Sequence, residues 1–189
     1  MIYIVSGLHR SGTSMMMSAL VEGGIIPIYS KQREKAMRLN NTKDYTVNPD
    51  GFYEVGQQEY MRLGFTSELP SECCVKIQAL GLPILSAAKG YKIIYMRRDP
   101  AAIKKSFIKA FSEREFNKKY DDWPTHYFAL LDGVKAIMQQ RRDVELLELQ
   151  FDDVISNPRK VFTQIAAMGV PIDINKAISI VKPEFKRCG

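Results

Sequence analysis

One stretch near the N-terminus constrains the fold of this chain more than any other. Residues 2–5 are a continuous apolar run, typical of a parallel strand buried on both faces. The run leads into a loop bracketed by Gly7 and Gly12, and a helix is expected from about 12 to 22, ended by Gly23-Gly24. Such a loop turns successive backbone N–H groups toward one point, where the helix N-terminus adds positive potential. The sequence therefore predicts an anion-binding loop at the carboxyl end of a central strand.

The rest of the chain continues this alternation of strand and helix. We expect further strands at 74–77, 91–96 and 144–149. We expect helices at 82–88, 100–111, 124–141 and 159–168, and a possible helix at 55–63, whereas 29–52 reads as a long, mostly irregular segment. Asp99 is a good N-cap for the second of these helices, whose apolar stripe would be Ile103, Phe107, Ala110 and Phe111.

This pattern predicts an α/β fold of three layers, a parallel sheet with helices on both faces. The chain has no internal repeat, low-complexity tract or linker, so a single domain is expected over 1–189. Ligands of such sheets bind at the carboxyl ends of the strands. Two polar segments, 7–14 and 97–100, fall at such ends.

Composition excludes several classes of protein. With 46% hydrophobic and 25% charged residues, the chain is neither disordered nor collagen-like nor a coiled coil. The longest apolar stretch, 79–88, is broken by Pro83 and is too short for a membrane span. Little sequence precedes the first strand, so we expect a cytoplasmic protein without a signal peptide or membrane contact. The three cysteines and two histidines show no spacing typical of a disulfide framework or a metal site.

Positive charge is concentrated in one segment. Residues 89–119 hold ten lysines and arginines against three acidic residues, a net charge of +7 in a chain whose net charge is +6. Such a segment indicates a polyanionic partner, such as a phosphorylated cofactor, an acidic substrate or nucleic acid, or else a solvated helix face.

The glycine loop departs from the pattern of nucleotide hydrolases. Its spacing is Gly-x-x-x-x-Gly, but Thr13 stands where those proteins carry a lysine, and Arg10 lies inside the loop instead. The strand at 91–96 runs into Arg97-Arg98 rather than into an aspartate that could hold magnesium. A loop of this composition is poorly equipped for a triphosphate and well equipped for an anionic group at a 5′ position.

At this point the residues resemble a known family. Residues 5–14, Val-Ser-Gly-Leu-His-Arg-Ser-Gly-Thr-Ser, resemble the 5′-phosphosulfate loop of sulfotransferases that use 3′-phosphoadenosine 5′-phosphosulfate (PAPS). Arg98-Asp99-Pro100 with Ser106 resembles the family's 3′-phosphate motif, an arginine followed by a serine eight residues later. Residues 75–78 and 149–158 are similar, more weakly, to two further family segments. The resemblance implies the sulfotransferase variant of the P-loop fold.

The resemblance also implies residue roles. PAPS, or its product adenosine 3′,5′-bisphosphate (PAP), would be bound without a metal by His9, Arg10, Ser11, Gly12, Thr13, Ser14, Arg98 and Ser106. Arg10 and Lys76 would stabilise charge during sulfuryl transfer to a hydroxyl or amine of a small-molecule, glycan or peptide acceptor. Residues 48–54 resemble an Asn-Pro-x-Gly-aromatic-x-Glu segment of bacterial relatives, which makes Glu54 the expected general base and His9 its rival. His126 is expected to cap or pack a helix, and the basic tail at 182–187 either covers the cofactor or is solvated.

Three other functions remain open from the sequence. A P-loop kinase would need the lysine that Thr13 replaces. A non-enzymatic polyanion binder would use the basic segment, although we assign Phe107 and Phe111 to a helix core rather than to base stacking. A relative that binds PAP or PAPS without transferring sulfate is consistent with the altered segment after Lys76.

Overall fold

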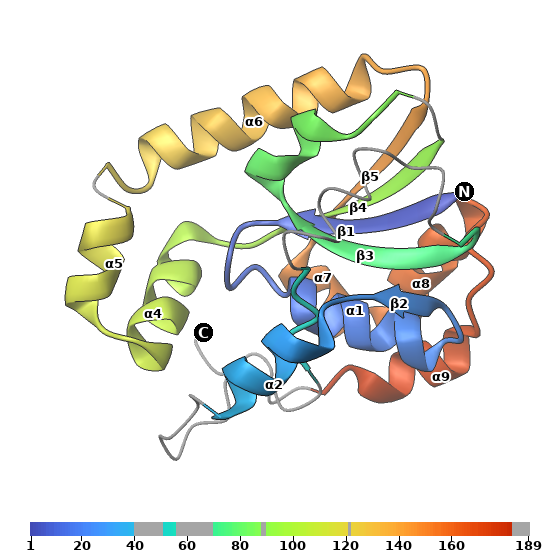
Figure 1. Ribbon diagram of the computed structural model, residues 1–189, viewed down its shortest axis with the longest axis horizontal. Coiled ribbons are helices and arrows are strands. Elements are labelled where there is room, and N and C mark those ends of the chain that lie inside the picture. Colours follow the sequence, from blue (N-terminus) through green and yellow to red (C-terminus); the bar gives the residue numbers. More distant parts are fainter. Residues whose placement is uncertain (40–50, 56–69, 88–89, 121, 183–189) are drawn as a thin grey trace.

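A five-stranded parallel sheet organises the computed structural model, which describes residues 1–39, 51–55, 70–87, 90–120 and 122–182. The strand order is β2-β3-β1-β4-β5, and every pair of neighbours is parallel (Figure 1). The strands are β1 (Ile2–Gly7), β2 (Ile26–Ile28), β3 (Cys73–Gln78), β4 (Tyr91–Arg97) and β5 (Val144–Gln150). The predicted α/β class with a parallel sheet is therefore confirmed.

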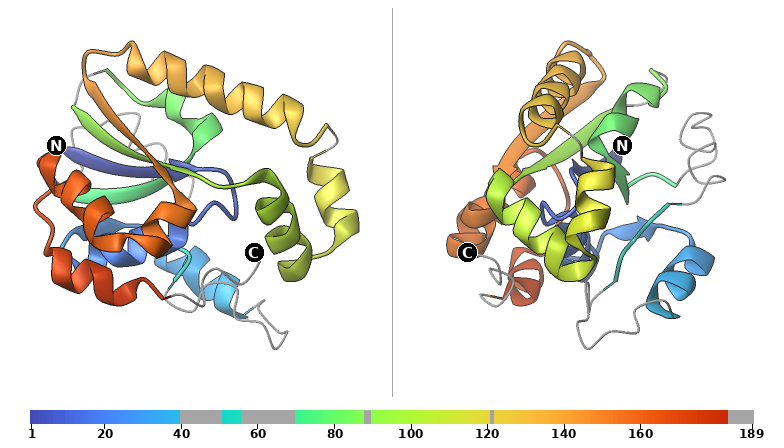
Figure 2. Two further views of the ribbon diagram at one scale, coloured as in Figure 1. Left: turned by 180° about the vertical axis from the view of Figure 1, so that it is seen from behind. Right: turned by 90° about the vertical axis from the view of Figure 1, so that its left-hand side faces the viewer.

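Helices cover both faces of the sheet. The helices of the described residues are α1 (Thr13–Glu22), α2 (Lys31–Leu39), the 3₁₀ helix η1 (Ala79–Ile84), α4 (Pro100–Ala110), α5 (Glu113–Lys119), α6 (Thr125–Gln139), α7 (Phe151–Ser156), α8 (Pro158–Ala167) and α9 (Ile174–Ile180). Figure 2 shows α6 and η1 on one side of the sheet and α1, α8 and α9 on the other. Among the described residues, no helix is both long enough and apolar enough to cross a membrane.

Alternation along β1 builds a core on each face. Ile2 and Ile4 pack in the cluster that includes η1 and α6, while Tyr3 and Val5 pack in the cluster that includes α1, α8 and α9. All four side chains are buried, as the continuous apolar run predicts for a central strand. Burying an aliphatic side chain of this size contributes roughly 1.5–3 kcal/mol, so β1 is fixed from both sides.

The helix α4 begins as its sequence predicts and ends differently. The Asp99 carboxylate accepts a hydrogen bond of 2.8 Å from the Ala102 N–H, and Pro100 occupies the first helical position. Ile103 and Phe107 are buried as expected and Ala110 is half-buried, but the prediction for Phe111 is wrong. Phe111 lies beyond the last helical residue and is 46% exposed, because the backbone leaves helical geometry there.

Three local predictions are corrected. The helix expected at 82–88 is instead the 3₁₀ helix η1, which begins earlier, at Ala79, and ends at Ile84, because the backbone of the next residue, Leu85, is extended. The segment expected to be irregular at 29–52 contains α2, and the short strand β2 precedes it. Of the possible helix at 55–63, Val55 is not helical and the remainder lies outside the described residues. The short helices α5, α7 and α9 were not predicted.

The strand register brings three chain segments to one edge of the sheet. Gly7, the last residue of β1, pairs with Gln78 of β3 and with Met96 of β4. The glycine loop therefore starts beside the ends of both neighbouring strands, and α4 and α5 lie beyond this edge (Figure 1). This is the edge at which parallel sheets bind their ligands.

Candidate functional site

Two glycines shape the loop between β1 and α1. Gly7 has a φ of 147° and Gly12 a φ of 96°. A Cβ atom on Gly7 would lie 2.6 Å from the Met96 carbonyl oxygen, and one on Gly12 would lie 2.5 Å from the Phe151 ring. Only glycine allows this backbone conformation and this close approach together.

The loop presents backbone N–H groups at the start of α1. Ser11 closes the turn, because its N–H (3.2 Å) and its hydroxyl (2.7 Å) both donate to the Leu8 carbonyl. Gly12 is the N-cap of α1 and has no side chain to accept from the first-turn N–H groups, which begin at Thr13 and Ser14. The structure therefore has the helix start that an anion site needs, and anion binding there stays a prediction.

A cluster of two arginines and a serine joins the loop to β4 and α4. Arg10 Nε donates a hydrogen bond of 3.0 Å to Ser106 Oγ, and Arg98 Nη1 donates one of 3.0 Å to the Arg10 carbonyl. Ser106 lies in α4 and is only 3% exposed. The Arg98 guanidinium lies 4.1 Å from the centroid of the Phe151 ring, a cation–π contact. Two motifs found separately in the sequence thus meet in one place.

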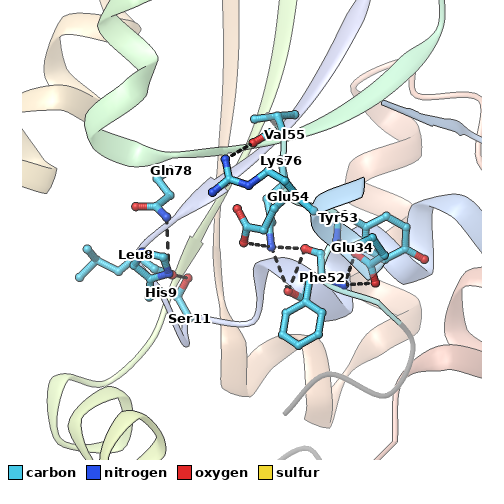
Figure 3. Close-up of polar contacts among 12 residues, drawn as sticks. Leu8, His9, Ser11, Glu34, Phe52, Tyr53, Glu54, Val55, Lys76 and Gln78 are labelled. Carbon is cyan, nitrogen blue, oxygen red and sulfur yellow. Dashed lines mark hydrogen bonds and ion pairs between the residues drawn. The ribbon is translucent and has the colours of Figure 1, made fainter. Parts of the chain in front are cut away.

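Lys76 lies on the other side of the loop, where β3 approaches α1. Its ammonium donates to Ser14 Oγ at 3.1 Å and to the Phe52 carbonyl, and it pairs with Glu54 Oε1 at 2.6 Å (Figure 3). The Lys76 side chain is 6% exposed and that of Glu54 is 21% exposed. Burial lowers the pKa of Lys76 below its ordinary value, and the Glu54 carboxylate offsets part of this shift.

Glu54 belongs to a short extended segment, residues 51–55, that runs beside β3. Glu54 and Lys76 form a parallel β-bridge, so the backbone as well as the ion pair joins them. The Glu54 carbonyl accepts a hydrogen bond of 3.0 Å from the Ser30 N–H, just before α2. The expected general base therefore lies beside the expected catalytic lysine.

His9 is held neutral at physiological pH. Burial, followed by the positive charge of Lys119, lowers the pKa of His9 to about 4, and Glu54 acts in the opposite direction. Its Nδ1 atom lies 3.5 Å from the side-chain amide nitrogen of Gln78 (Figure 3). The same burial and positive charge disfavour the protonated form of His9, so they weaken it as a proton acceptor, and its role as the rival base stays a prediction. His126, by contrast, is exposed near the start of α6, with its ring edge-on to Tyr127 at 5.8 Å.

Sequence reasoning did not single out three residues that contact this site. Phe151 supports Arg98 and packs against Gly12, and the only signal was its place in a weakly matching segment. Lys119, at the end of α5, acts electrostatically on His9 and Glu54, and burial lowers its own pKa. In the sequence, Lys119 is one of ten lysines and arginines in the basic segment at 89–119, and nothing distinguishes it from the other nine. Glu34 accepts hydrogen bonds from the backbone of the segment at 51–55.

No metal cluster accompanies the site in the part of the chain that the structure describes, where no three His, Cys, Asp or Glu side chains gather. Cys73 and Cys74 are buried free thiols, and burial raises the pKa of Cys74 to about 12. Residues 48–50 and most of the expected basic tail lie outside the described residues.

Comparison with known proteins identifies the fold. No protein-family model matches the chain, and no curated protein matches it in sequence. Among solved structures, it superimposes on the sulfotransferase domain of the olefin synthase from Synechococcus PCC 7002 with a TM-score of 0.51. The two share 16% identity over 98% of this chain and 82% of that one. The likeness confirms the resemblance to sulfotransferases at the level of the fold.

A second solved structure agrees with the first. A retinol dehydratase in complex with androsterone and the inactive cofactor PAP superimposes with a TM-score of 0.54 and 16% identity. The match covers 97% of this chain but 64% of the retinol dehydratase, so that protein carries additional sequence. A sugar kinase from Janibacter sp. HTCC2649 matches at a TM-score of 0.46 and 11% identity, a value that does not establish a common fold.

Proposed function

We propose that this chain transfers a sulfuryl group from PAPS to a hydroxyl or amine acceptor. The observation that carries the proposal is the direct contact of Arg10 with Ser106, supported by Arg98 on the Arg10 carbonyl. PAPS bears one anionic group at the 5′ position of its ribose and a second at the 3′ position. The contact places the N-terminus of α1 beside the pair formed by Arg98 and Ser106. A ligand with anionic groups at the 5′ and 3′ positions requires two such sites side by side.

The residues present fit the adenosine bisphosphate part of this ligand. Gly12 gives the start of α1 an N-cap without a side-chain acceptor, which leaves room for the 5′ anion. The Arg98 guanidinium is fixed against Phe151, so little side-chain entropy remains to be lost on binding a phosphate. Ser106 adds a buried hydroxyl to the same cluster. We therefore assign the 5′ group to the loop and the 3′-phosphate to Arg98 and Ser106.

The remaining residues divide the chemistry between charge stabilisation and proton removal. When bound, PAPS supplies the sulfuryl group: the acceptor atom bonds to sulfur while the bond to the bridging phosphate oxygen breaks, leaving its electron pair on PAP. Arg10 and Lys76 place positive charge beside the loop, where negative charge develops on the leaving phosphate. Glu54 is the carboxylate that takes the proton of the acceptor, provided that the acceptor comes within hydrogen-bond reach.

One observation favours a second candidate, a PAP- or PAPS-binding protein without transfer. An ammonium group has three N–H donors, and in the described residues Lys76 directs them to Ser14, Phe52 and Glu54. Transfer requires that one of these contacts opens so that Lys76 reaches the sulfuryl oxygens. Binding alone does not require it.

Calorimetric titration with PAP, with magnesium–ATP as the comparison ligand, tests the proposed cofactor. We expect micromolar binding of PAP and little response to ATP, because Thr13 replaces the lysine that nucleotide kinases use. Tight ATP binding, or binding of neither ligand, contradicts the proposal. PAP release from PAPS in the presence of phenols, sugars and amines then separates transfer from binding alone.

A further inference from the structure

The segment at 51–55 is held in place by α2 as well as by β3. The Glu34 carboxylate of α2 accepts hydrogen bonds from the Phe52 N–H (3.0 Å to Oε1, 3.1 Å to Oε2) and from the Tyr53 N–H (3.0 Å to Oε2). Figure 3 shows Glu34 on one side of the segment and Lys76 on the other. The segment at 51–55 therefore places the Glu54 carboxylate and the Phe52 carbonyl beside Lys76.

Two further contacts strengthen the connection between α2 and this segment. Arg33 Nη1 donates a hydrogen bond of 2.9 Å to the Val55 carbonyl, and the Ser30 N–H donates one of 3.0 Å to the Glu54 carbonyl. Tyr53 has a φ of 53°, a left-handed conformation that is strained for a residue with a side chain. The charge-assisted hydrogen bonds that the Phe52 and Tyr53 N–H groups donate to Glu34 act against that strain.

We propose that Glu34 is a positioning residue, which fixes the backbone of Phe52 and Tyr53 so that Glu54 and the Phe52 carbonyl meet Lys76. The inference rests on the proposed function, because it is the proposed roles of Lys76 and Glu54 that make their placement matter. Glu34 also acts on Lys76 through its charge, since it raises the pKa of that lysine. It acts through other residues and does not itself touch the reacting atoms.

The position of Glu34 near the start of α2 allows a purely structural alternative. Glu34 lies in the first turn of α2, where an acidic residue stabilises a helix through its dipole. A variant that loses only this effect would be slightly less stable and would keep an ordered segment at 51–55. Amide exchange at Phe52 and Tyr53 separates the two roles, because only the positioning role protects those N–H groups.

The test compares Glu34→Ala and Glu34→Gln with Lys35→Ala, a matched control at an exposed position on the same helix. For each protein we would measure PAP affinity, KM for PAPS, kcat for PAP release from PAPS, thermal stability, and hydrogen exchange of residues 52–55 without ligand. Glu34→Ala is expected to lower kcat roughly 10- to 100-fold, with PAP affinity and KM within about twofold, since misplacement by 1 Å can cost that much. Its Phe52 and Tyr53 amides should exchange at least about tenfold faster. Lys35→Ala should match the unmodified chain.

Glu34→Gln provides a graded second variant. Its amide oxygen can still accept from both N–H groups, but its NH₂ group would face the Phe52 N–H, so kcat and exchange should be intermediate. Unchanged exchange in Glu34→Ala, or a loss of PAP affinity as large as the loss in kcat, would overturn the positioning role. Failure of the unmodified chain to bind PAP would instead contradict the proposed function, and the exchange measurement would still decide whether Glu34 holds the segment.

Discussion

The guanidinium of Arg10 donates a hydrogen bond of 3.0 Å to the hydroxyl of Ser106, 96 positions further along the chain. The two residues come from different motifs, one in the loop after β1 and one inside α4. Because the two motifs are in contact, a ligand bound by one of them lies next to the other. PAP binding and sulfuryl transfer are two properties of the proposed site, and they can be measured separately.

Replacing Arg98 with alanine should weaken PAP binding by about 1.5–3 kcal/mol, or roughly 10- to 150-fold, the contribution of a charged hydrogen bond. Arg97→Ala is the matched control, because Arg97 is the preceding residue and pairs instead with Asp132 at 2.7 Å. Calorimetric titration with PAP measures both. Equal affinities of the two variants would contradict the assignment of the 3′-phosphate to Arg98.

Arg10→Ala should affect transfer more than binding. The proposed role of Arg10 is to stabilise charge that develops on the leaving phosphate, and removing one such donor typically costs 10²–10³ in kcat. PAP binding should weaken by less than about tenfold, since Arg98 and Ser106 remain. Parallel measurement of kcat and of PAP affinity checks this, and equal losses in both would make Arg10 a binding residue only.

Lys76 and Glu54 should be energetically coupled. In a double-mutant cycle of Lys76→Met and Glu54→Gln, we expect a coupling of about 0.5–3 kcal/mol in the free energy of unfolding, the range for contacting residues in one network. Urea denaturation of the four proteins measures it. Additive effects would mean that the ion pair at 2.6 Å contributes nothing to stability.

The pH dependence of stability should carry a signature of His9. Its pKa is lowered to about 4 in the folded chain from an ordinary 6.5, so between these values the unfolded chain binds more protons. Stability from this group is therefore fully present above pH 6.5 and is lost as the pH falls toward 4. From pH 7 to pH 5 the loss should be about 1–2 kcal/mol larger in the unmodified chain than in His9→Gln. Urea denaturation at both pH values tests this, and equal losses would contradict it.

Gly12→Ala should destabilise the chain by at least about 2 kcal/mol, because the added Cβ would lie 2.5 Å from the Phe151 ring at a φ of 96°. Gly133→Ala is the opposite control. It lies inside α6 with open space around its Cβ position, and alanine should stabilise the helix by roughly 0.5–1 kcal/mol. Thermal unfolding of both variants checks the contrast.

Sequence reasoning was most successful where the determining interactions are local. Residues 2–12 combine an apolar run with glycines, and Asp99-Pro100 begins a helix, so each segment carries its own structural signal. It failed where the structure depends on partners elsewhere in the chain. The α2 sequence is mostly charged and polar and predicts no buried face, and the helix is joined to the segment at 51–55 by Arg33 and Glu34. The helix expected at 82–88 was wrong because the helical turn begins earlier, at Ala79, and the backbone becomes extended at Leu85.

By itself the sequence determined the class of fold, the glycine loop between β1 and α1 and the start of α4, because strand periodicity, glycine geometry and helix caps act over a few residues. Only the tertiary structure decided that Arg10 contacts Ser106, that Phe151 supports Arg98, and that Lys76 pairs with Glu54. These contacts join residues that are 22 to 96 positions apart. Their geometry depends on strand order and register, which side-chain spacing along a single chain does not specify.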